Sequence, residues 1–426
     1  MSQHARLTRR IVGLVSARLP DLELQQVPDS RDPRWVSWPL VTVLRALLTC
    51  LAASCTGLRQ AEELTDQMSS AMRRKLGIRG RIPDTTMRTI ASGLDPDDIR
   101  QCMHQQIRAA SRRKALVPDH LPFNVAMLDG KSTALPSCDD HFAQRQSNDS
   151  RLIGLLRTMT CSLVTTAAQP CVDAIPIPAN TNEMGHFRCC VDLLLAAYGS
   201  IDLFRMVAAD AGNCCQAHAR HVRDAGLHYL FGLKDNQPTL AAEAARLLGG
   251  LEQPVACSDD RKGNSRRVVR RLFVTEQLAG FEWEHLRTVL RVQSLTYEHG
   301  KLAATEDRYF VSSLPLSRLT GAQWLRIVRL MWGVENAVHC TLDKSMREDE
   351  HPWIQSNPKA ALVIALLRRI AYNLLALFRS VTLRSERSRS TTWKLLMRWV
   401  ELALLTATHD DVAGLRSRYA PASATS

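Results

Sequence analysis

The chain has 426 residues, of which 45% are hydrophobic and 23% charged. This composition excludes bulk disorder and suggests two or three folded domains. Lys and Arg number 55 against 42 Asp and Glu, which gives a formal net charge of +13, and 46 of the 55 are Arg. Because the planar guanidinium bonds phosphate through two N–H groups, this surplus favours a polyanionic partner. A codon bias toward Arg and Ala is the alternative explanation.

Two apolar stretches were considered as membrane spans, residues 40–53 and 360–381. Arg45 interrupts the first, and Arg368 and Arg369 lie at the centre of the second. Neither therefore offers the ~20 uninterrupted apolar residues that a span requires. The N-terminal sequence MSQHARLTRR leads into no signal-peptide core. We therefore expect a cytoplasmic protein with no membrane partner.

The twelve cysteines are scattered and include no CxxC motif, so we expect reduced and mostly buried thiols rather than a disulfide framework. One local group was weighed as a zinc site: Cys214, Cys215, His218 and His221. Adjacent cysteines fit no common zinc spacing, and no second pair of ligands lies nearby. Zinc is therefore the least favoured of the chemical interpretations.

Residues 1–118 are predicted to form a helical N-terminal domain. Its expected helices are separated by tight turns and cover residues 40–55, 58–72, 84–91 and 96–114. Asp84 or Thr85 is expected to cap the third helix. Basic residues on the turns, such as 73–75, are typical of a DNA-binding helical module. A basic helical bundle with no contact role explains the pattern equally well.

The pattern changes after Pro118 to an alternation of strands and helices, which predicts a mixed α/β sheet. Strands are expected over 123–129, 158–167, 171–178, 204–209 and 227–233, with helices over 184–198 and 218–224. Residues 268–313 alternate with a period of two and predict an antiparallel β insertion at about 250–315. Long helices are predicted over 317–344 and 358–379. A basic helical tail, residues 381–426, carries Arg384, Arg387 and Arg389 and one more helix near 393–405.

Two of the predicted strands end in an acid, Asp129 and Asp210. The carboxyl ends of strands form the functional edge of an open α/β sheet, so these acids are candidates to share divalent cations. Glu335, inside a predicted helix, is the best third carboxylate. Mg²⁺ prefers such oxygen ligands. A helix cap, a salt bridge or a turn beside glycine is the alternative for each acid taken singly.

Six stretches in one order carry a family resemblance. They are AMLDGKS (126–132), NTNEM (180–184), VAADAGNCCQAHARHV (207–222), YLFGLKDNQPTL (229–240), MWGVENAVHCTLDKSMRED (331–349) and LLRRIAYNLL (366–375). With them, residues 31–379 resemble the DDE transposases of bacterial insertion sequences. The resemblance is to the branch of the IS-four superfamily, of IS-As type, that has an associated N-terminal domain and a β insertion before the final Glu.

The resemblance implies an α/β fold with a ribonuclease-H-like catalytic core over residues 119–380. Asp129, Asp210 and Glu335 would then bind two Mg²⁺ ions, with Mn²⁺ as a substitute. The implied activity is hydrolysis of the element's ends followed by strand transfer into target DNA. The implied partners are the inverted-repeat ends, target DNA and a second copy of the chain in a synaptic dimer.

The resemblance also implies roles for neighbours of the acids. Lys131 would meet a phosphate, and Lys234, Asn236 and Gln237 would hold the site or DNA. Residues flanking Glu335 would contact the transposon end: Arg329, Trp332, Asn336 and His339. Surface charge or core packing is the alternative for each neighbour.

The chain departs from the superfamily's Y-(2)-R-(3)-E-(6)-K spacing, where Val328, Met331 and Leu342 stand. Two other functions therefore stay open: a DNA-binding protein of the same family without catalysis, and a nuclease that hydrolyses without joining.

Overall fold

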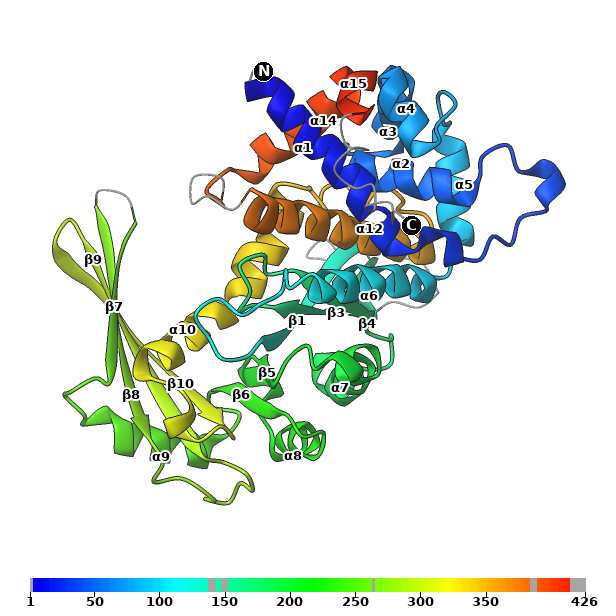
Figure 1. Ribbon diagram of the computed structural model, residues 1–426. Coiled ribbons are helices and arrows are strands. Elements are labelled where there is room, and N and C mark those ends of the chain that lie inside the picture. The colour runs from blue at the N-terminus through cyan, green and yellow to red at the C-terminus, as the bar shows by residue number, and fades with distance from the viewer. Residues whose placement is uncertain (1–2, 137–142, 147–151, 263–264, 384–388, 414–426) are drawn as a thin grey trace, which may run out of the picture.

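The computed structural model describes residues 3–136, 143–146, 152–262, 265–383 and 389–413. Figure 1 shows three parts: a central sheet, a layer of helices from both ends of the chain above it, and a wing of long strands on one side. Arg384, Arg387 and the end of the tail (414–426) lie outside the described residues.

The centre of the sheet holds three antiparallel strands followed by two parallel ones. β1 (Val125–Pro136) pairs with β3 (Leu152–Leu163), which pairs with β4 (Cys171–Pro176) and, at its far end, with β2 (Ala143–Gln146). On its other side β1 runs parallel to β5 (Met206–Ala209), and β5 runs parallel to β6 (His228–Leu233). The short strand β5 is buried throughout, as parallel strands covered on both faces are. This topology confirms the predicted ribonuclease-H-like core.

Helices cover both faces of this core. α7 (Glu183–Tyr198) and α8 (Gln216–Asp224) connect the strands and pack on one face together with α6 (Pro96–Arg112) and α9 (Pro238–Gly249). α10 (Gly321–Met331) packs on the other face with Trp324 at its centre. The carboxyl ends of β1, β5 and β6 are left at one edge of the sheet.

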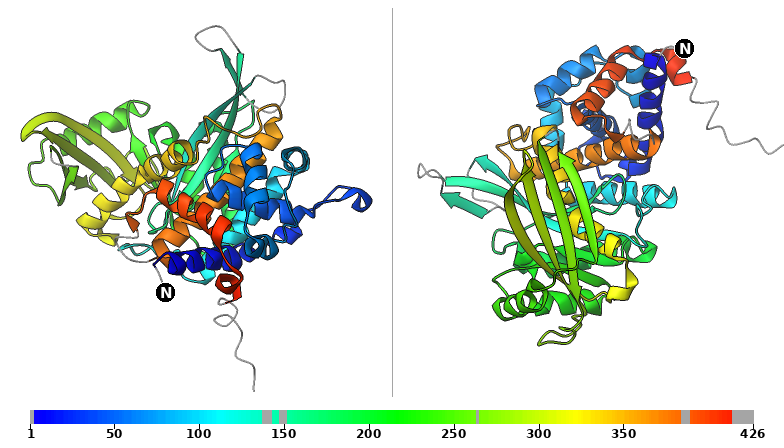
Figure 2. Two further views of the ribbon diagram at one scale, coloured as in Figure 1. Left: turned by 90° about the horizontal axis from the view of Figure 1, so that it is seen from above. Right: turned by 90° about the vertical axis from the view of Figure 1, so that its left-hand side faces the viewer.

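The predicted β insertion is confirmed, and it continues the core sheet. It consists of β7 (Ala256–Lys262), β8 (Arg266–Thr275), β9 (Thr288–Glu298) and β10 (Lys301–Ser312), all antiparallel. β10 pairs with β6 from Tyr309 to Ser312. The first half of β10 is exposed and its last residues are buried. The insertion therefore reaches away from the core as the wing in Figure 2.

The helical N-terminal region has α1 (Gln3–Arg18), α2 (Leu40–Ala52), α3 (Leu58–Gln67), α4 (Ser70–Leu76) and α5 (Asp84–Gly93) before α6. The single helix predicted over 58–72 is wrong, because the Ser69 hydroxyl accepts from the Met72 backbone N–H and starts a separate helix. The predicted cap of α5 is also wrong. Asp84 is its first helical residue, Pro83 occupies the capping position, and no side chain caps it.

α12 (Pro358–Leu377) is the central helix of the helical layer. It is long and apolar enough to cross a membrane by composition, but 94% of its apolar window is buried inside the protein. α2, α5 and α6 pack against it from the N-terminal side, and α14 (Trp393–Thr406) and α15 (His409–Ala413) pack against α1, α2 and α4. Both ends of the chain thus share one apolar core. The domain boundaries at 118 and 380 stay predictions.

The long helix predicted over 317–344 is interrupted. α10 ends at Met331, a π-helical turn spans Val334–His339, and α11 (Cys340–Lys344) follows. A π turn holds one more residue than an α turn, so it changes the direction of the side chains that follow. Such turns occur frequently at functional sites, and this one contains Glu335.

Candidate active site

The three candidate acids line one cavity of about 800 Å³ at the edge of the sheet. Asp210 directly follows β5, as predicted. The predicted strand end at Asp129 is wrong, because β1 continues past this residue to Pro136 in its pairing with β3. Leu128 pairs with Ala209 in the parallel register, so the two acids occupy the next positions on neighbouring strands. Glu335 enters from the π-helical turn. The fold therefore brings together three acids that are far apart along the chain.

Asp129 has the most perturbed environment of the three. Burial raises its pKa to about 7, and the negative charges of Glu183, Asp210 and Glu335 act in the same direction. Like charges that cannot spread apart disfavour ionisation, and a divalent cation between them relieves that repulsion. The hard oxygen donors and their surplus of negative charge fit Mg²⁺ or Mn²⁺.

Asp210 is held by the loop that it begins. The Asn213 backbone N–H and side-chain amide donate to its Oδ1 over 3.4 and 3.1 Å. Asn236 donates to the carbonyls of Ala211 and Cys214, and Gln237 also donates to Cys214. Of the two roles expected for Asn236 and Gln237, these bonds favour holding the site.

Lys234 is exposed and lines the same cavity, which leaves its ammonium available to solvent and to a ligand. Its expected role toward DNA stays a prediction.

The residues flanking Glu335 form the wall between the core and the insertion. The Arg308 guanidinium lies 4.5 Å from the centre of the Trp332 ring, and Phe310 meets that ring edge-on. Arg329 pairs with Asp260 of β7 over 2.8 Å. The exposed Asn336 amide donates to the Trp332 carbonyl. Trp332 therefore anchors the insertion, and its expected contact with DNA stays a prediction.

His339 is buried beside the first acid instead of at the surface. Its Nδ1 lies 3.5 Å from Asp129 Oδ2. Burial, with the positive charges of Arg369 and Lys131, lowers the pKa of His339 to about 3. The imidazole is therefore neutral at physiological pH and supplies no charge to neutralise Asp129.

Lys131 does not lie among the residues that line the acid cavity. Its side chain is buried, and its Nζ contacts Asp343 at 2.6 Å and Asp349 at 3.1 Å. Glu348 lies 4.0 Å from the same ammonium and accepts from Arg369 at 2.7 Å. We call the group the buried ion cluster, after its buried members Lys131, Glu348, Arg368 and Arg369; the partly exposed Asp343 and Asp349 complete it. These contacts, made to residues more than two hundred positions away, had no signal in the sequence.

Glu183, the first residue of α7, was missed as a site residue. It belongs to the NTNEM stretch, but no role was assigned to it from sequence. Its half-buried carboxylate lies against Gly130, next to Asp129. Burial and the charge of Asp210 raise the pKa of Glu183.

The residues weighed for zinc have other partners. His218 Nδ1 lies 2.9 Å from the Asn213 carbonyl oxygen, and the ring stacks on Phe187. His221 Nε2 lies 2.8 Å from Asp192. In the described part of the chain, no group of three or more His, Cys, Asp or Glu side chains is arranged to hold a metal ion. That statement includes the acid cavity. Mg²⁺ does not need such a cage, because it binds through one or two carboxylates and completes its shell with water and phosphate.

Comparison with known proteins identifies the catalytic region. A family model described as "Transposase DDE domain" matches residues 128–374, which is more than half of the chain. The chain belongs to the DDE transposase family. Its matched region contains Asp129, Asp210 and Glu335 together with the whole insertion.

Related proteins match over a shorter region. The chain is 30% identical to the "Putative protein YbfL" and 29% identical to the "H repeat-associated putative transposase YhhI", both of Escherichia coli strain K12, over 183 residues. Each match covers 40% of this chain and 47% of the relative, so the chain spans about half the length of these curated relatives. The "Putative transposase YncI" of Escherichia coli O157:H7 is 25% identical over 188 residues, which cover 40% of this chain and 45% of that protein.

A solved structure also aligns with the chain. The cryo-EM structure of the piggyBac transposase synaptic complex with hairpin DNA superimposes with a TM-score of 0.40 at 11% identity. The alignment covers 99% of this chain and 83% of that one. The assignment to the IS-As-type branch stays a prediction.

Proposed function

We propose that this protein is a transposase that hydrolyses the ends of an insertion sequence and joins them to target DNA by Mg²⁺-dependent phosphoryl transfer. The observation that carries the proposal is the meeting of Asp129, Asp210 and Glu335 in one cavity inside the family domain. Carboxylates at this edge of an α/β sheet are placed to bind cations and phosphate together.

Asp129 has the central role among the acids, because its carboxyl is affected by the charges of both Asp210 and Glu335. Asp210 is fixed by its Asn213 bonds, and Glu335 by the π-helical turn. A pair of bound Mg²⁺ ions would supply a nucleophile at neutral pH and neutralise the leaving oxygen. The acids would hold those ions, and Asp129 would release its proton on binding, because ligand carboxylates must be ionised.

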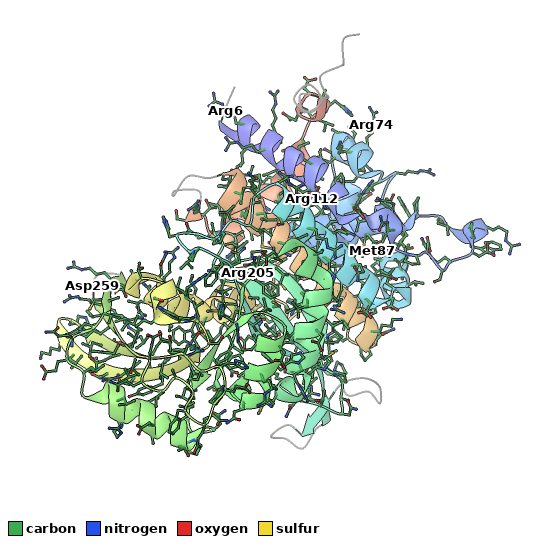
Figure 3. The ribbon with its side chains drawn as sticks, turned by 60° about the horizontal axis from the view of Figure 1, so that its bottom comes forward. Arg6, Arg74, Met87, Arg112, Arg205 and Asp259 are labelled. Atoms are coloured by element: carbon green, nitrogen blue, oxygen red, sulfur yellow. The ribbon has the colours of Figure 1, made fainter. Side chains whose placement is uncertain are left out.

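DNA is the proposed partner of the cavity and of basic residues on the N-terminal helices. Lys234 and Arg308 line the cavity and offer positive charge beside the acids. Figure 3 shows Arg6, Arg74 and Arg112 on three N-terminal helices. Binding through such residues would weaken steeply with salt, because each phosphate contact releases a counterion. Two copies, each holding one end, would form the synaptic dimer.

The test is strand transfer in vitro with DNA that carries the element's own ends. Asp129→Asn and Glu335→Gln are expected to retain DNA binding and lose both cleavage and joining in Mg²⁺ or Mn²⁺. Glu252→Gln, which removes an exposed acid outside the cavity, is the matched control and should behave as wild type. Joining at the wild-type level by either active-site variant would remove that residue from the mechanism.

A DNA-binding protein without catalysis is the second candidate. It is favoured by the buried apolar residues at the positions of the superfamily's Tyr, Arg and Lys: Val328, Met331 and Leu342. These apolar side chains cannot make the polar contacts to the cleaved DNA end that Tyr, Arg and Lys would make at the same positions in the superfamily. This candidate predicts binding to the ends with no Mg²⁺-dependent cleavage. A third outcome, cleavage without joined products, would indicate a nuclease.

A further inference from the structure

We infer that Glu183 is a fourth carboxylate of the active site and contributes to binding the cation shared by Asp129 and Asp210. The inference rests on the proposed function and adds a ligand outside the three acids of the DDE pattern. It follows from where α7 begins and from the space that Gly130 leaves for the Glu183 side chain.

The start of α7 is held firmly beside β1. Arg157 on β3 donates to the carbonyls of Pro178 and Thr181 over 2.9 and 2.8 Å. The Asn182 side chain then caps the helix by accepting from the Gly185 N–H. Because β3 pairs directly with β1, these bonds fix the Glu183 backbone relative to Asp129. The position of Glu183 is thus set by two independent sets of contacts.

Gly130 provides the room that the Glu183 carboxylate occupies. A Cβ atom added to Gly130 would lie 1.5 Å from Glu183 Oε1 and 2.0 Å from its Cδ. Gly130 of β1 pairs with Met159 of β3, and the backbone φ angle of Gly130 is not positive. Its backbone conformation therefore suits any residue. What only glycine permits here is the approach of a carboxylate to the backbone next to Asp129.

Within the described residues the Glu183 carboxylate has no direct hydrogen-bond or ion-pair partner, and the charge of Arg157 offsets burial and the charge of Asp210 only in part, because the pKa of Glu183 is still raised. Keeping an unpaired carboxylate half-buried beside other acids is costly unless a cation compensates it. The contact with Gly130 places the Glu183 carboxylate next to Asp129, and the charge of Asp210 raises the pKa of both carboxyls. Glu183 is therefore positioned to act together with Asp129 and Asp210.

The competing explanation is that Glu183 only stabilises the N-terminus of α7, as acids in a first turn do. The two explanations predict opposite effects of Glu183→Gln on the metal-free protein. Loss of a helix-stabilising charge would lower the thermal midpoint. Relief of repulsion beside Asp129 and Asp210 would raise it, and it is the rise that we expect.

The direct test measures Mn²⁺ binding to the full chain by isothermal titration calorimetry. Glu183→Gln should weaken the affinity about 10- to 100-fold, the range found when groups that support a metal site are removed. It should also reduce the rise in thermal midpoint that Mn²⁺ produces. Glu252→Gln should change neither value. Unchanged Mn²⁺ affinity in Glu183→Gln would overturn the inference.

A double-mutant cycle with Gly130 tests the contact itself. Gly130→Ala should displace the Glu183 carboxylate and weaken Mn²⁺ binding by a similar factor in the otherwise wild-type chain. In a Glu183→Ala background the added methyl finds empty space, so Gly130→Ala should cause no further loss. Equal losses in both backgrounds would overturn the inference.

Asp129→Asn separates this inference from the proposed function. If Asp129→Asn abolishes Mn²⁺ binding and joining while Glu183→Gln leaves both unchanged, the inference fails and the proposed function stands. If Asp129→Asn is itself silent, the proposed function fails.

Discussion

Asp129 and Lys131 lie two residues apart on β1, yet they enter two opposite kinds of charged environment. Asp129 faces the acid cavity with Asp210 and Glu335, and the charge of Glu183 adds to theirs. Lys131 enters the buried ion cluster, where three cations meet three carboxylates. A balanced cluster stabilises its own geometry, whereas an unbalanced one requires an additional cation.

Burial alone does not explain the difference. Glu348 is almost completely buried, which by itself raises its pKa, but the charges of Arg369, Arg368 and Lys131 outweigh burial and lower it. Asp129 is more exposed, and its pKa is nevertheless raised to about 7. The sign of the surrounding charge therefore explains why the pKa of Glu348 is lowered and that of Asp129 is raised.

The largest expected effect is on catalysis. Asp129→Asn should reduce strand transfer at least about 10³-fold, or about 4 kcal/mol in the activation barrier, because it removes a central cation ligand. The metal-free protein should remain folded. If Asp129→Asn lost activity only because it unfolded, its circular dichroism spectrum would show the loss of helix and strand. Asp129 would then be a structural residue like Lys131, not a functional one.

Lys131→Met should affect stability first. Removing Lys131 leaves Asp343 and Asp349 without their cation, whereas Glu348 keeps Arg368 and Arg369. Because both aspartates are partly exposed, the cost in the free energy of unfolding should be about 2 kcal/mol. Urea denaturation in the absence of metal would measure it. Lys301→Met, at an exposed position of β10, is the matched control and should cost little. An unchanged midpoint for Lys131→Met would show that the cluster is not structural.

The raised pKa of Asp129 should make the stability of the protein depend on pH. Its pKa is about 7 in the folded state against an ordinary value of 3.8, so the folded protein binds this proton more tightly than the unfolded chain. The contribution to the free energy of unfolding therefore falls as pH rises from about 4 to about 7 and stays low above that.

Without metal, Asp129→Asn should be more stable than wild type by about 2 kcal/mol at pH 8, and the difference should disappear near pH 4. Mg²⁺ should raise the stability of wild type and leave that of Asp129→Asn nearly unchanged. Denaturation at several pH values, with and without Mg²⁺, measures both effects. A variant less stable than wild type at pH 8 would contradict the raised pKa.

Asp343→Asn should have the smallest effect, about 1 kcal/mol or less in urea denaturation. Its side chain is about a third exposed, and Asp349 still pairs with Lys131 when it is neutralised. A loss of stability as large as that of Lys131→Met would mean that the cluster depends on every one of its members. The cluster would then differ even more clearly from the acid cavity.

Strand and helix patterns were sufficient to predict a mixed α/β sheet and the β insertion, and the family resemblance implied the ribonuclease-H-like core. The patterns ended the first strand at Asp129, but β1 continues to Pro136 because its pairing with β3 extends that far. Local propensity also predicted a helix around Glu335. It did not predict the π-helical turn, because that turn depends on packing between α10, α11 and the sheet. The break between α3 and α4 was missed for a different, local reason: it depends on a single cap, the Ser69 hydroxyl.

The sequence alone determined this protein's family and its alternation of strands and helices, and it identified three candidate acids, because each of these depends on short stretches of residues. Only the tertiary structure decided that Lys131 turns into a buried ion cluster and that Glu183 approaches Asp129 over Gly130. Both outcomes depend on contacts between segments distant in the chain. The charge environment of a side chain is set by those contacts, so neighbours on one strand can have opposite roles.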